Sequence, residues 1–431
     1  MKIKMFCLLT TALLMCCPSL FAFDEFENEG IHYVINFYEI EEQCAWVTST
    51  AGIFLKDGVQ NEYTGDIVIP NKVWHDGQEY RVIGIYMNAF KRCTLNSLTL
   101  SEGVTYLAPA GASAFDSTYV ESIYLPSTFR IEPDAYSNGI NGYCLFSGCK
   151  GLKKIVIASD NPVYDSRDNC NALIETATNT LLEGCENTII PSSVETINAQ
   201  AFLNRDIKEC HIPYGVKFIK GSVFENCKQL ENVTIPESVS RIYADGLFQG
   251  CELLENVTIP ETAILMGAPE YDCENEKAIA GLMFRGCYSL KGFQIPDYVT
   301  IIGIQAFRDC KNLSYIVIPE SVSDIRAFAF IGCENLNSIT MSAGVPPSVK
   351  EYCFDASAYS RISLTVPEGS EEAYRQHEVW GKFQYINAPA GIKEIYNPSE
   401  TNSRMTYDLS GRRVSRTGKG IYIVGGRKVV K

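Results

Sequence analysis

The chain has 431 residues and a formal net charge of −14, with 46% hydrophobic and 20% charged residues. An acidic chain repels phosphate backbones and anionic lipid headgroups, so binding to nucleic acid or to a membrane surface would need a basic patch, and the only basic cluster lies at the C-terminus. The length suits two or three ordinary domains or one long repeat array.

Residues 1–22 are predicted to be an export signal peptide. Lys2 and Lys4 precede an apolar run that ends at Cys17 and is too short to span a bilayer. We expect cleavage after Ala22. The alternative is a lipoprotein acylated at Cys16 or Cys17. On either route the protein is exported and is secreted or held at the outer cell surface.

A repeat dominates residues 89–385. Its pattern is A-F-x-x-C-x-x-L-x-x-I-x-I-P-x-x-V-x-x-I, and 23 residues separate Phe284 from Phe307 and Phe307 from Phe330. A fixed period of this length indicates stacked coils. The further copies begin at Phe90, Phe115, Phe146, Phe202, Phe224, Phe248 and Phe354.

Each coil is predicted to contain one short strand. The segment L-x-x-I-x-I has the period of a strand with one buried face, and the following proline ends it because proline has no N–H for a continuing ladder. An apolar pair such as Val239 and Ile242 then continues the chain on the convex side. No coil can bury its apolar residues alone, so the pattern predicts a repeat solenoid.

The repeat resembles the leucine-rich repeats of BspA-like surface proteins from Bacteroides-type bacteria, over roughly residues 60 to 385. The resemblance implies a right-handed superhelix of mainly short β-strands, with irregular or short helical convex segments. Residues 63–70 and 77–83 resemble the β-rich N-terminal cap, which we assign to residues 23–88, and residues 366–383, with Tyr374 and Trp380, resemble the closing coil. In three coils Thr118, Arg205 and Ser357 replace the consensus cysteine.

Two insertions interrupt the solenoid. Residues 266–281 form an acidic loop, which we interpret as a solvated insertion, with binding of a cation or a basic partner as the alternative. Residues 160–186 are predicted to fold as a hairpin in which Leu173 faces Leu182 and Cys170 faces Cys185. In an exported protein that cysteine pair is a candidate cross-strand disulfide, and two free thiols are the alternative.

Residues 391–431 form a C-terminal β tail with alternating strands and a basic end. The tail resembles the sorting or attachment segment of exported Bacteroidetes proteins. A plain terminal hairpin is the alternative reading.

The chemistry-bearing residues follow the repeat. Seven of the 17 cysteines stand three residues after a repeat phenylalanine, which predicts a column of buried, unpaired thiols instead of four ligands converging on zinc. The four histidines are far apart, and no catalytic motif stands at a strand-to-helix turn. We therefore expect no catalytic residue, no metal site, no cofactor and no enzymatic activity.

The strands instead present a candidate binding face. Its outward row is mostly uncharged and rich in hydroxyl groups, which suits extended contacts with protein or glycan. The row comprises Thr99, Tyr124, Val156, His211, Thr234, Thr258, Gln294, Val317, Thr340 and Thr365.

These features predict a non-catalytic exported scaffold that binds an extracellular protein or glycan at the cell surface. The family resemblance extends this function to adhesion, with no nucleic-acid partner and a membrane link only through a lipid or tail anchor. A secreted hydrolase or inhibitor that uses the insertion loops, and a structural envelope component, are the alternatives.

Overall fold

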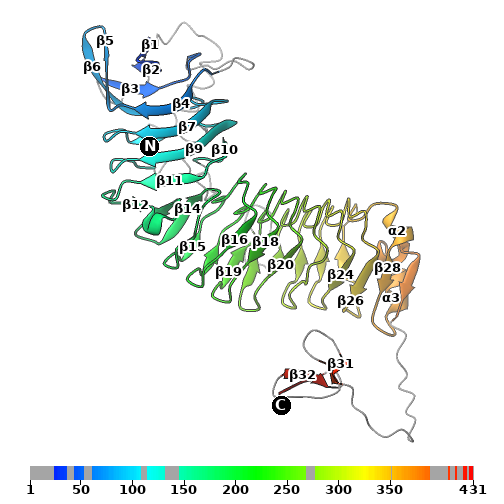
Figure 1. Ribbon diagram of the computed structural model, residues 1–431. Helices are drawn as coiled ribbons and strands as arrows, with labels where there is room; N and C mark the ends of the chain where they lie inside the picture. Colours follow the sequence, from blue (N-terminus) through cyan, green and yellow to red (C-terminus); the bar gives the residue numbers. More distant parts are fainter. Residues whose placement is uncertain are drawn as a thin grey trace, which may run out of the picture. The chain divides into compact units, whose positions relative to one another are not determined.

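The computed structural model describes residues 24–35, 43–52, 61–107, 114–131, 145–267, 277–350 and 352–388, with four short strands between residues 406 and 430 (Figure 1). The chain divides into two compact units, Met1–Pro389 and Ala390–Lys431. The predicted signal peptide, including Cys16 and Cys17, lies outside the described residues.

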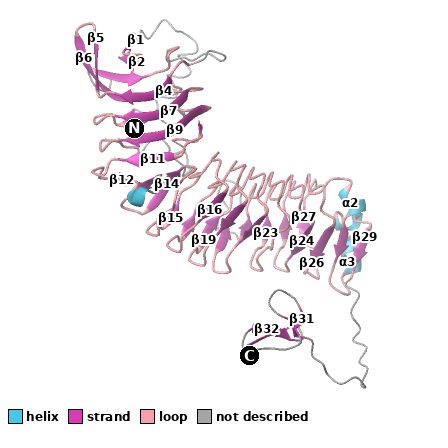
Figure 2. Ribbon diagram, in the orientation of Figure 1, coloured by secondary structure: helices cyan, strands magenta, loops and turns pink. Residues whose placement is uncertain are grey.

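Strands make up most of the regular structure in the first unit (Figure 2). The helical segments among the described residues are single turns or little more: η1 (Arg167–Asn169), α2 (Ala358–Arg361), α3 (Glu371–Gln376) and η3 (Trp380–Lys382).

Six strands lie between residues 24 and 85, where the sequence predicts a β-rich cap. Five of them form a sheet in the order β1-β2-β3-β6-β5, and β8 also pairs with β6. Their bounds are β1 (Asp24–Asn28), β2 (Ile31–Ile35), β3 (Cys44–Val47), β5 (Lys72–His75), β6 (Gln78–Ile85) and β8 (Tyr106–Leu107). The sixth strand, β4 (Thr64–Ile69), pairs in parallel with the first repeat strand and so joins the cap to the solenoid.

The predicted strands of neighbouring coils pair in parallel over most of the array, which we call the first ladder. The ladder is divided into three sections, and among the described residues strands are hydrogen-bonded to one another only within a section. They are β7 (Thr94–Leu100), β9 (Thr118–Leu125), β10 (Cys149–Lys150) and β11 (Lys154–Ile157); β16 (Glu209–His211), β18 (Asn232–Thr234) and β20 (Asn256–Thr258); and β24 (Tyr315–Ile318), β26 (Ser338–Met341), β28 (Ser363–Thr365) and β29 (Tyr385–Asn387).

The segment after the proline forms a second parallel ladder, where the sequence predicts irregular or short helical structure. A turn in which the proline carbonyl accepts the N–H three residues later, as from Pro236 to Val239 at 3.1 Å, leads into six of its short strands, those that begin at Thr196, Phe218, Arg241, Ile264, Ile301 and Asp324. A coil of this length that contains two strands and a turn leaves no room for a helix. The strands are β14 (Thr180–Gly184), β15 (Thr196–Ile197), β17 (Phe218–Ile219), β19 (Arg241–Tyr243) and β21 (Ile264–Met266), then β22 (Ala278–Ile279), β23 (Ile301–Ile302), β25 (Asp324–Ile325) and β27 (Ser348–Val349).

The repeat phenylalanines form a column of buried rings between the ladders. From Phe202 to Phe354, consecutive rings lie 5.3 to 5.7 Å apart between centroids, with interplanar angles of 2° to 16°. Burying one such side chain contributes about 1.5–3 kcal/mol to folding. The main chain follows the same column, since the N–H of Phe224 donates to the Leu247 carbonyl of the next coil at 3.1 Å. Each coil thus depends on its neighbours for both burial and hydrogen bonding.

The repeat cysteines are buried and unpaired, as the sequence predicts. Each thiol in the long central array donates a hydrogen bond to the carbonyl of the phenylalanine one coil earlier, at 3.0 to 3.1 Å. These pairs are Cys227 to Phe202, Cys251 to Phe224, Cys287 to Phe248, Cys310 to Phe284 and Cys333 to Phe307.

Two departures from the consensus keep the same hydrogen bond. The hydroxyl of Thr118 donates to the Phe90 carbonyl, and the guanidinium of Arg205 reaches the Phe146 carbonyl at 2.9 Å. In these two coils a threonine and an arginine therefore supply the buried donor that cysteine supplies elsewhere.

Aromatic side chains close the C-terminal end of the stack. The ring of Phe354 lies 5.8 Å from that of Trp380, whose indole N–H donates to the Pro347 carbonyl at 3.0 Å. The buried Tyr374 hydroxyl donates to the Ala343 carbonyl at 2.8 Å. These residues cover the last phenylalanine, which would otherwise face water.

The second unit is a small antiparallel sheet in the order β31-β30-β32-β33. Its strands are β30 (Thr406–Tyr407), β31 (Arg413–Val414), β32 (Ile421–Val424) and β33 (Arg427–Val430).

The thiol hydrogen bond predicts a difference between two isosteric replacements. Cys251→Thr keeps a donor for the Phe224 carbonyl, whereas Cys251→Val does not. We expect the valine variant to be less stable by about 1 kcal/mol, the usual net value of a buried hydrogen bond. Urea unfolding of both variants measures the difference, and a valine variant at least as stable as the threonine variant would contradict it.

Candidate functional site

The outward side of the first ladder, which we call the strand face, contains all ten residues that the sequence singles out. None of the ten is buried. They alternate with core residues, so that Thr340 stands between the fully buried Ile339 and the nearly buried Met341. The two-residue period of a strand thus places the row on the surface.

Parallel pairing brings the ten residues together in three runs. Each run has its members side by side in register: Thr99, Tyr124 and Val156; His211, Thr234 and Thr258; and Gln294, Val317, Thr340 and Thr365. No strand pairing joins one run to the next within the described residues, so the face consists of three sections.

The same register adds residues that the sequence reasoning missed. Val68 pairs with Thr99 at one end, and Asn387 pairs with Thr365 at the other. Val68 belongs to an I-x-I-P segment of the cap, at residues 67–70, and that motif could have identified it.

A second outward row, two residues earlier on each strand, was also missed. In the last section it consists of Tyr315, Ser338, Ser363 and Tyr385, which are paired in register. The equivalent positions of the middle section are Glu209, Asn232 and Asn256. The face is therefore at least two residues wide.

The histidine of the strand face has no thiolate beside it. His211 is exposed, whereas the neighbouring Cys210 packs against the core, and burial raises the pKa of its thiol to about 12. Because they point to opposite sides of the strand, the two cannot act as a thiolate–imidazole pair. Among the residues that the structure describes, no cluster of three or more His, Cys, Asp or Glu side chains could hold a metal ion.

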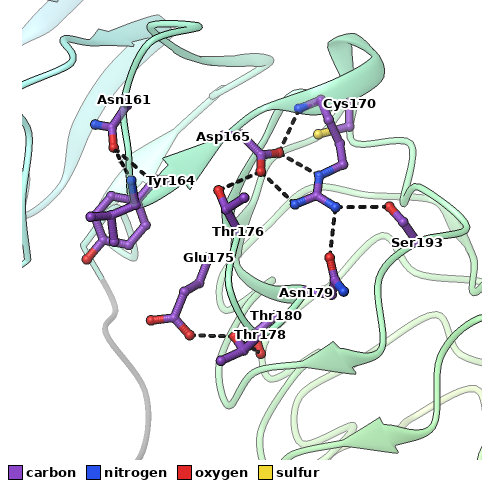
Figure 3. Close-up of polar contacts among 12 residues, drawn as sticks. Asn161, Tyr164, Asp165, Cys170, Glu175, Thr176, Thr178, Asn179, Thr180 and Ser193 are labelled. Atoms are coloured by element: carbon purple, nitrogen blue, oxygen red, sulfur yellow. Dashed lines mark hydrogen bonds and ion pairs between the residues drawn. The ribbon is translucent and has the colours of Figure 1, made fainter.

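The inserted hairpin holds the densest polar network (Figure 3). Asp165, in β12 (Tyr164–Asp165), accepts hydrogen bonds from Arg167 Nε at 2.7 Å, Arg167 Nη2 at 2.6 Å and the Thr176 hydroxyl at 2.8 Å. The guanidinium also reaches Asn179 at 2.8 Å and Ser193 at 3.3 Å. Burial raises the pKa of Asp165, but these bonds outweigh it and hold the pKa below its usual value. Through the bond from Arg167 to Ser193, the network links the hairpin to the next coil.

The hairpin register differs from the predicted one. Between β13 (Ala172–Glu175) and β14, Leu173 pairs with Glu183, and after a bulge Ile174 pairs with Leu181. The prediction that Leu173 faces Leu182 is therefore wrong. The extra residue of the bulge shifts every pair on its Cys185 side by one position.

The two hairpin cysteines, a candidate disulfide in the sequence, are separate buried thiols in the structure. Cys170 packs in the core of the following coils, and Cys185 in the core of the preceding ones. The Cys185 thiol donates to the Asn171 carbonyl at 3.1 Å. The two cysteines do not face each other because the bulge aligns Cys185 with a position other than Cys170.

A buried ion pair lies where the hairpin meets the repeat array. Glu183 and Arg205 are 1% and 2% exposed, with Oε2 and Nη2 3.6 Å apart. The guanidinium also donates to the carbonyls of Gly184, Cys149 and Phe146, each at 2.9 Å. Burial raises the pKa of Glu183 to about 7, although Arg205 and nearby backbone N–H groups oppose the shift. The charged and polar atoms of the Arg205 guanidinium therefore have partners, and we assign this pair a structural role at the point where the hairpin joins the repeats.

The acidic loop at residues 266–281 is described only at its ends, where Met266 and Lys277 form an isolated bridge. Residues 268–276 lie outside the described residues. Within the described part of the chain, no helix has both the length and the apolar character needed to cross a membrane.

Comparison with protein families matches residues 78–170, 179–271 and 277–404 to the BspA type leucine-rich repeat region, in six copies. A search of curated proteins found no match.

Similar solved structures include the pneumococcal vaccine antigen PcpA, at 14% identity, covering 85% of this chain and 98% of that one, with a TM-score of 0.44. A leucine-rich repeat protein from Eubacterium ventriosum is 17% identical, covering 74% and 90%, with a TM-score of 0.43. One from Bacteroides ovatus is 21% identical, covering 82% and 80%, with a TM-score of 0.40.

We expect Cys170 and Cys185 both to be free in the folded protein, because the bulge aligns neither with the other. Alkylation in denaturant without reductant, followed by peptide mass spectrometry, should label both residues. A disulfide-linked peptide that contains the two cysteines would contradict the observed register.

The buried Glu183 predicts a pH dependence of stability. Its folded pKa of about 7 lies above the ordinary value of about 4.3, so its contribution to stability is largest at low pH and is lost as the pH rises through 7. From pH 5 to pH 8, the urea midpoint of the wild type should fall relative to that of Glu183→Gln, which does not titrate. A difference between the two midpoints that is constant with pH would refute the raised pKa.

Proposed function

Because the chain belongs to the BspA-type leucine-rich-repeat family, we propose that it is an exported, non-catalytic scaffold that binds an extracellular protein or glycan through its strand face. The observation that supports the proposal is that threonine hydroxyl groups on that face have no hydrogen-bond partner among the described residues.

Three threonine hydroxyl groups of the strand face are not used by the fold. Among the described residues, no hydrogen bond involves the side chains of Thr234, Thr258 and Thr340. At the turns, by contrast, the Ser238 hydroxyl donates to the Val216 carbonyl at 2.9 Å, and the Ser321 hydroxyl donates to the Val299 carbonyl at 2.6 Å. The turns use their hydroxyls to join coils, and the strand face leaves its hydroxyls for a ligand.

The scaffold beneath the face supports binding without reorganisation. Thr234 and Thr340 are each fixed by the buried residues on either side of them and by the parallel register with two neighbouring coils. A surface held in this way loses little conformational entropy when a ligand binds.

The thiols of the repeats support a non-catalytic role. Burial raises the pKa of Cys149 to about 12 and that of Cys287 further still. A thiol that remains protonated at neutral pH is a poor nucleophile.

Export and surface location are part of the proposal. They rest on the predicted signal at residues 1–22 and on the tail at residues 391–431, which we propose is a sorting or attachment segment. Adhesion to host or bacterial surfaces is the role that such a scaffold would serve.

A charge placed on the strand face should weaken binding. Thr340→Glu introduces a carboxylate among uncharged neighbours, whereas Ser348→Glu places the same charge at an exposed position of the second ladder. We expect the first variant to lose at least about tenfold in affinity, equal to about 1.4 kcal/mol, and the second to retain wild-type binding.

The measurement is binding of the full chain to immobilised laminin, collagen and a glycan array, with circular dichroism to confirm that both variants are folded. Equal losses in the two variants would place the binding surface elsewhere.

A further inference from the structure

The last section of the strand face, on β24, β26, β28 and β29, has a composition unlike the other two. Eight outward residues lie there in two rows: Tyr315, Ser338, Ser363 and Tyr385, and Val317, Thr340, Thr365 and Asn387. We propose that this surface binds a neutral oligosaccharide that runs across the four strands between Tyr315 and Tyr385. The inference rests on the proposed function and names the chemical class of its ligand.

The ring of Tyr315 lies where Gly292, in the preceding coil, has no side chain. A Cβ added at Gly292, in the preceding coil, would lie 3.2 Å from both Cζ and Oη of Tyr315. The ring therefore extends over the space that a side chain at position 292 would occupy. It remains 56% exposed, so the absence of a side chain at Gly292 lets the ring rest on the backbone with much of its surface in solvent.

Tyr385 stands at the opposite end of the same row and is 53% exposed. Three steps between neighbouring strands separate it from Tyr315, which corresponds to about 14 Å at the usual spacing of about 4.8 Å. No aromatic contact or hydrogen bond engages either side chain among the described residues. Two unoccupied aromatic rings thus bracket the hydroxyl groups between them.

The surface between the tyrosines is polar and free to bind. Ser338 and Ser363 stand between them in the same row, with Thr340 and Thr365 beside these in the second row. Asn387 donates to the Ser363 hydroxyl at 3.3 Å, and the side chains of Ser338, Thr340 and Thr365 make no hydrogen bond among the described residues. Hydroxyl groups both donate and accept, as the hydroxyls of a sugar do.

Charge favours a neutral ligand over a protein. None of the eight residues is charged, whereas the equivalent rows elsewhere include Glu209 in the middle section and Asp66 and Lys154 in the first. About a quarter of the residues of an average protein are charged, and a protein partner would place some of its charges against a surface that has none to pair with them.

A sugar ring matches the remaining chemistry. A pyranose has one apolar face of C–H groups, which packs against an aromatic ring, and a rim of hydroxyl groups, which exchange hydrogen bonds with serine, threonine and asparagine. A chain of such rings can occupy both tyrosines and the hydroxyls between them at once. A single sugar would reach only one tyrosine, so an oligosaccharide is the ligand that fits.

Isothermal titration of the full chain with neutral hexasaccharides tests the proposal, with cellohexaose, xylohexaose, laminarihexaose and maltohexaose as probes and hexagalacturonate as the charged comparison. At least one neutral probe should bind. Tyr315→Ala and Tyr385→Ala should each weaken it about tenfold, whereas Tyr315→Phe should keep most of the affinity because it keeps the ring. Tyr214→Ala, which removes an exposed tyrosine at a turn, should have no effect.

Three results would overturn the assignment. Neutral sugar binding that survives both alanine variants would place the site elsewhere on the chain. Tighter binding of hexagalacturonate than of every neutral probe would contradict the charge argument. Binding of laminin or collagen that Thr340→Glu abolishes, with no sugar bound at all, would remove the glycan and leave the proposed function intact. If neither sugar nor protein binding responds to any strand-face variant, the proposed function fails as well.

Discussion

Each repeat phenylalanine of this protein is buried against the phenylalanine of a neighbouring coil, and the remaining features of the fold follow from that dependence. The ring column requires a constant rise from coil to coil, which the two parallel ladders and the hydrogen bonds at the phenylalanine turn supply. The cysteine beside each ring donates to the backbone of the previous coil and so completes the junction. Stability is therefore distributed over nearest-neighbour contacts, as expected for a linear repeat array.

The inserted hairpin shows what happens where this rule is interrupted. Its two strands contribute side chains to two different cores, with Leu173 in the preceding one and Ile174 in the following one. The change from one core to the other occurs at the bulge between these residues, beside the buried Glu183 and Arg205. An ion pair there costs desolvation, yet its guanidinium donates hydrogen bonds to three backbone carbonyls, those of Gly184, Cys149 and Phe146.

Polar side chains that join neighbouring coils lie at different positions of the repeat from those of the proposed binding face. Hydroxyl and thiol groups at the turns and in the core bond to neighbouring coils, whereas the side chains of Thr234, Thr258 and Thr340 on the strand face make no hydrogen bond among the described residues. The sections of the face are built from the same parallel pairing and differ in their outward side chains. Specificity can then change coil by coil through substitutions such as tyrosine at position 315 and glycine at position 292, at little cost to the fold.

The sequence by itself determined the period, the inward residues, the column of buried thiols and the outward row from Thr99 to Thr365, because each of these follows from local periodicity. It did not determine the second ladder, the donor role of Arg205, or the fate of Cys170 and Cys185. The second ladder depends on main-chain pairing between coils. The donor role of Arg205 and the state of the two cysteines depend on contacts between residues 15 to 59 positions apart. Tyr315 and Gly292 likewise become one feature only when stacking places their coils side by side. The hydrophobic pattern of the sequence indicates which face of a coil each residue occupies. The strand register and the hydrogen-bond partners of a side chain depend instead on the free energy of the assembled stack.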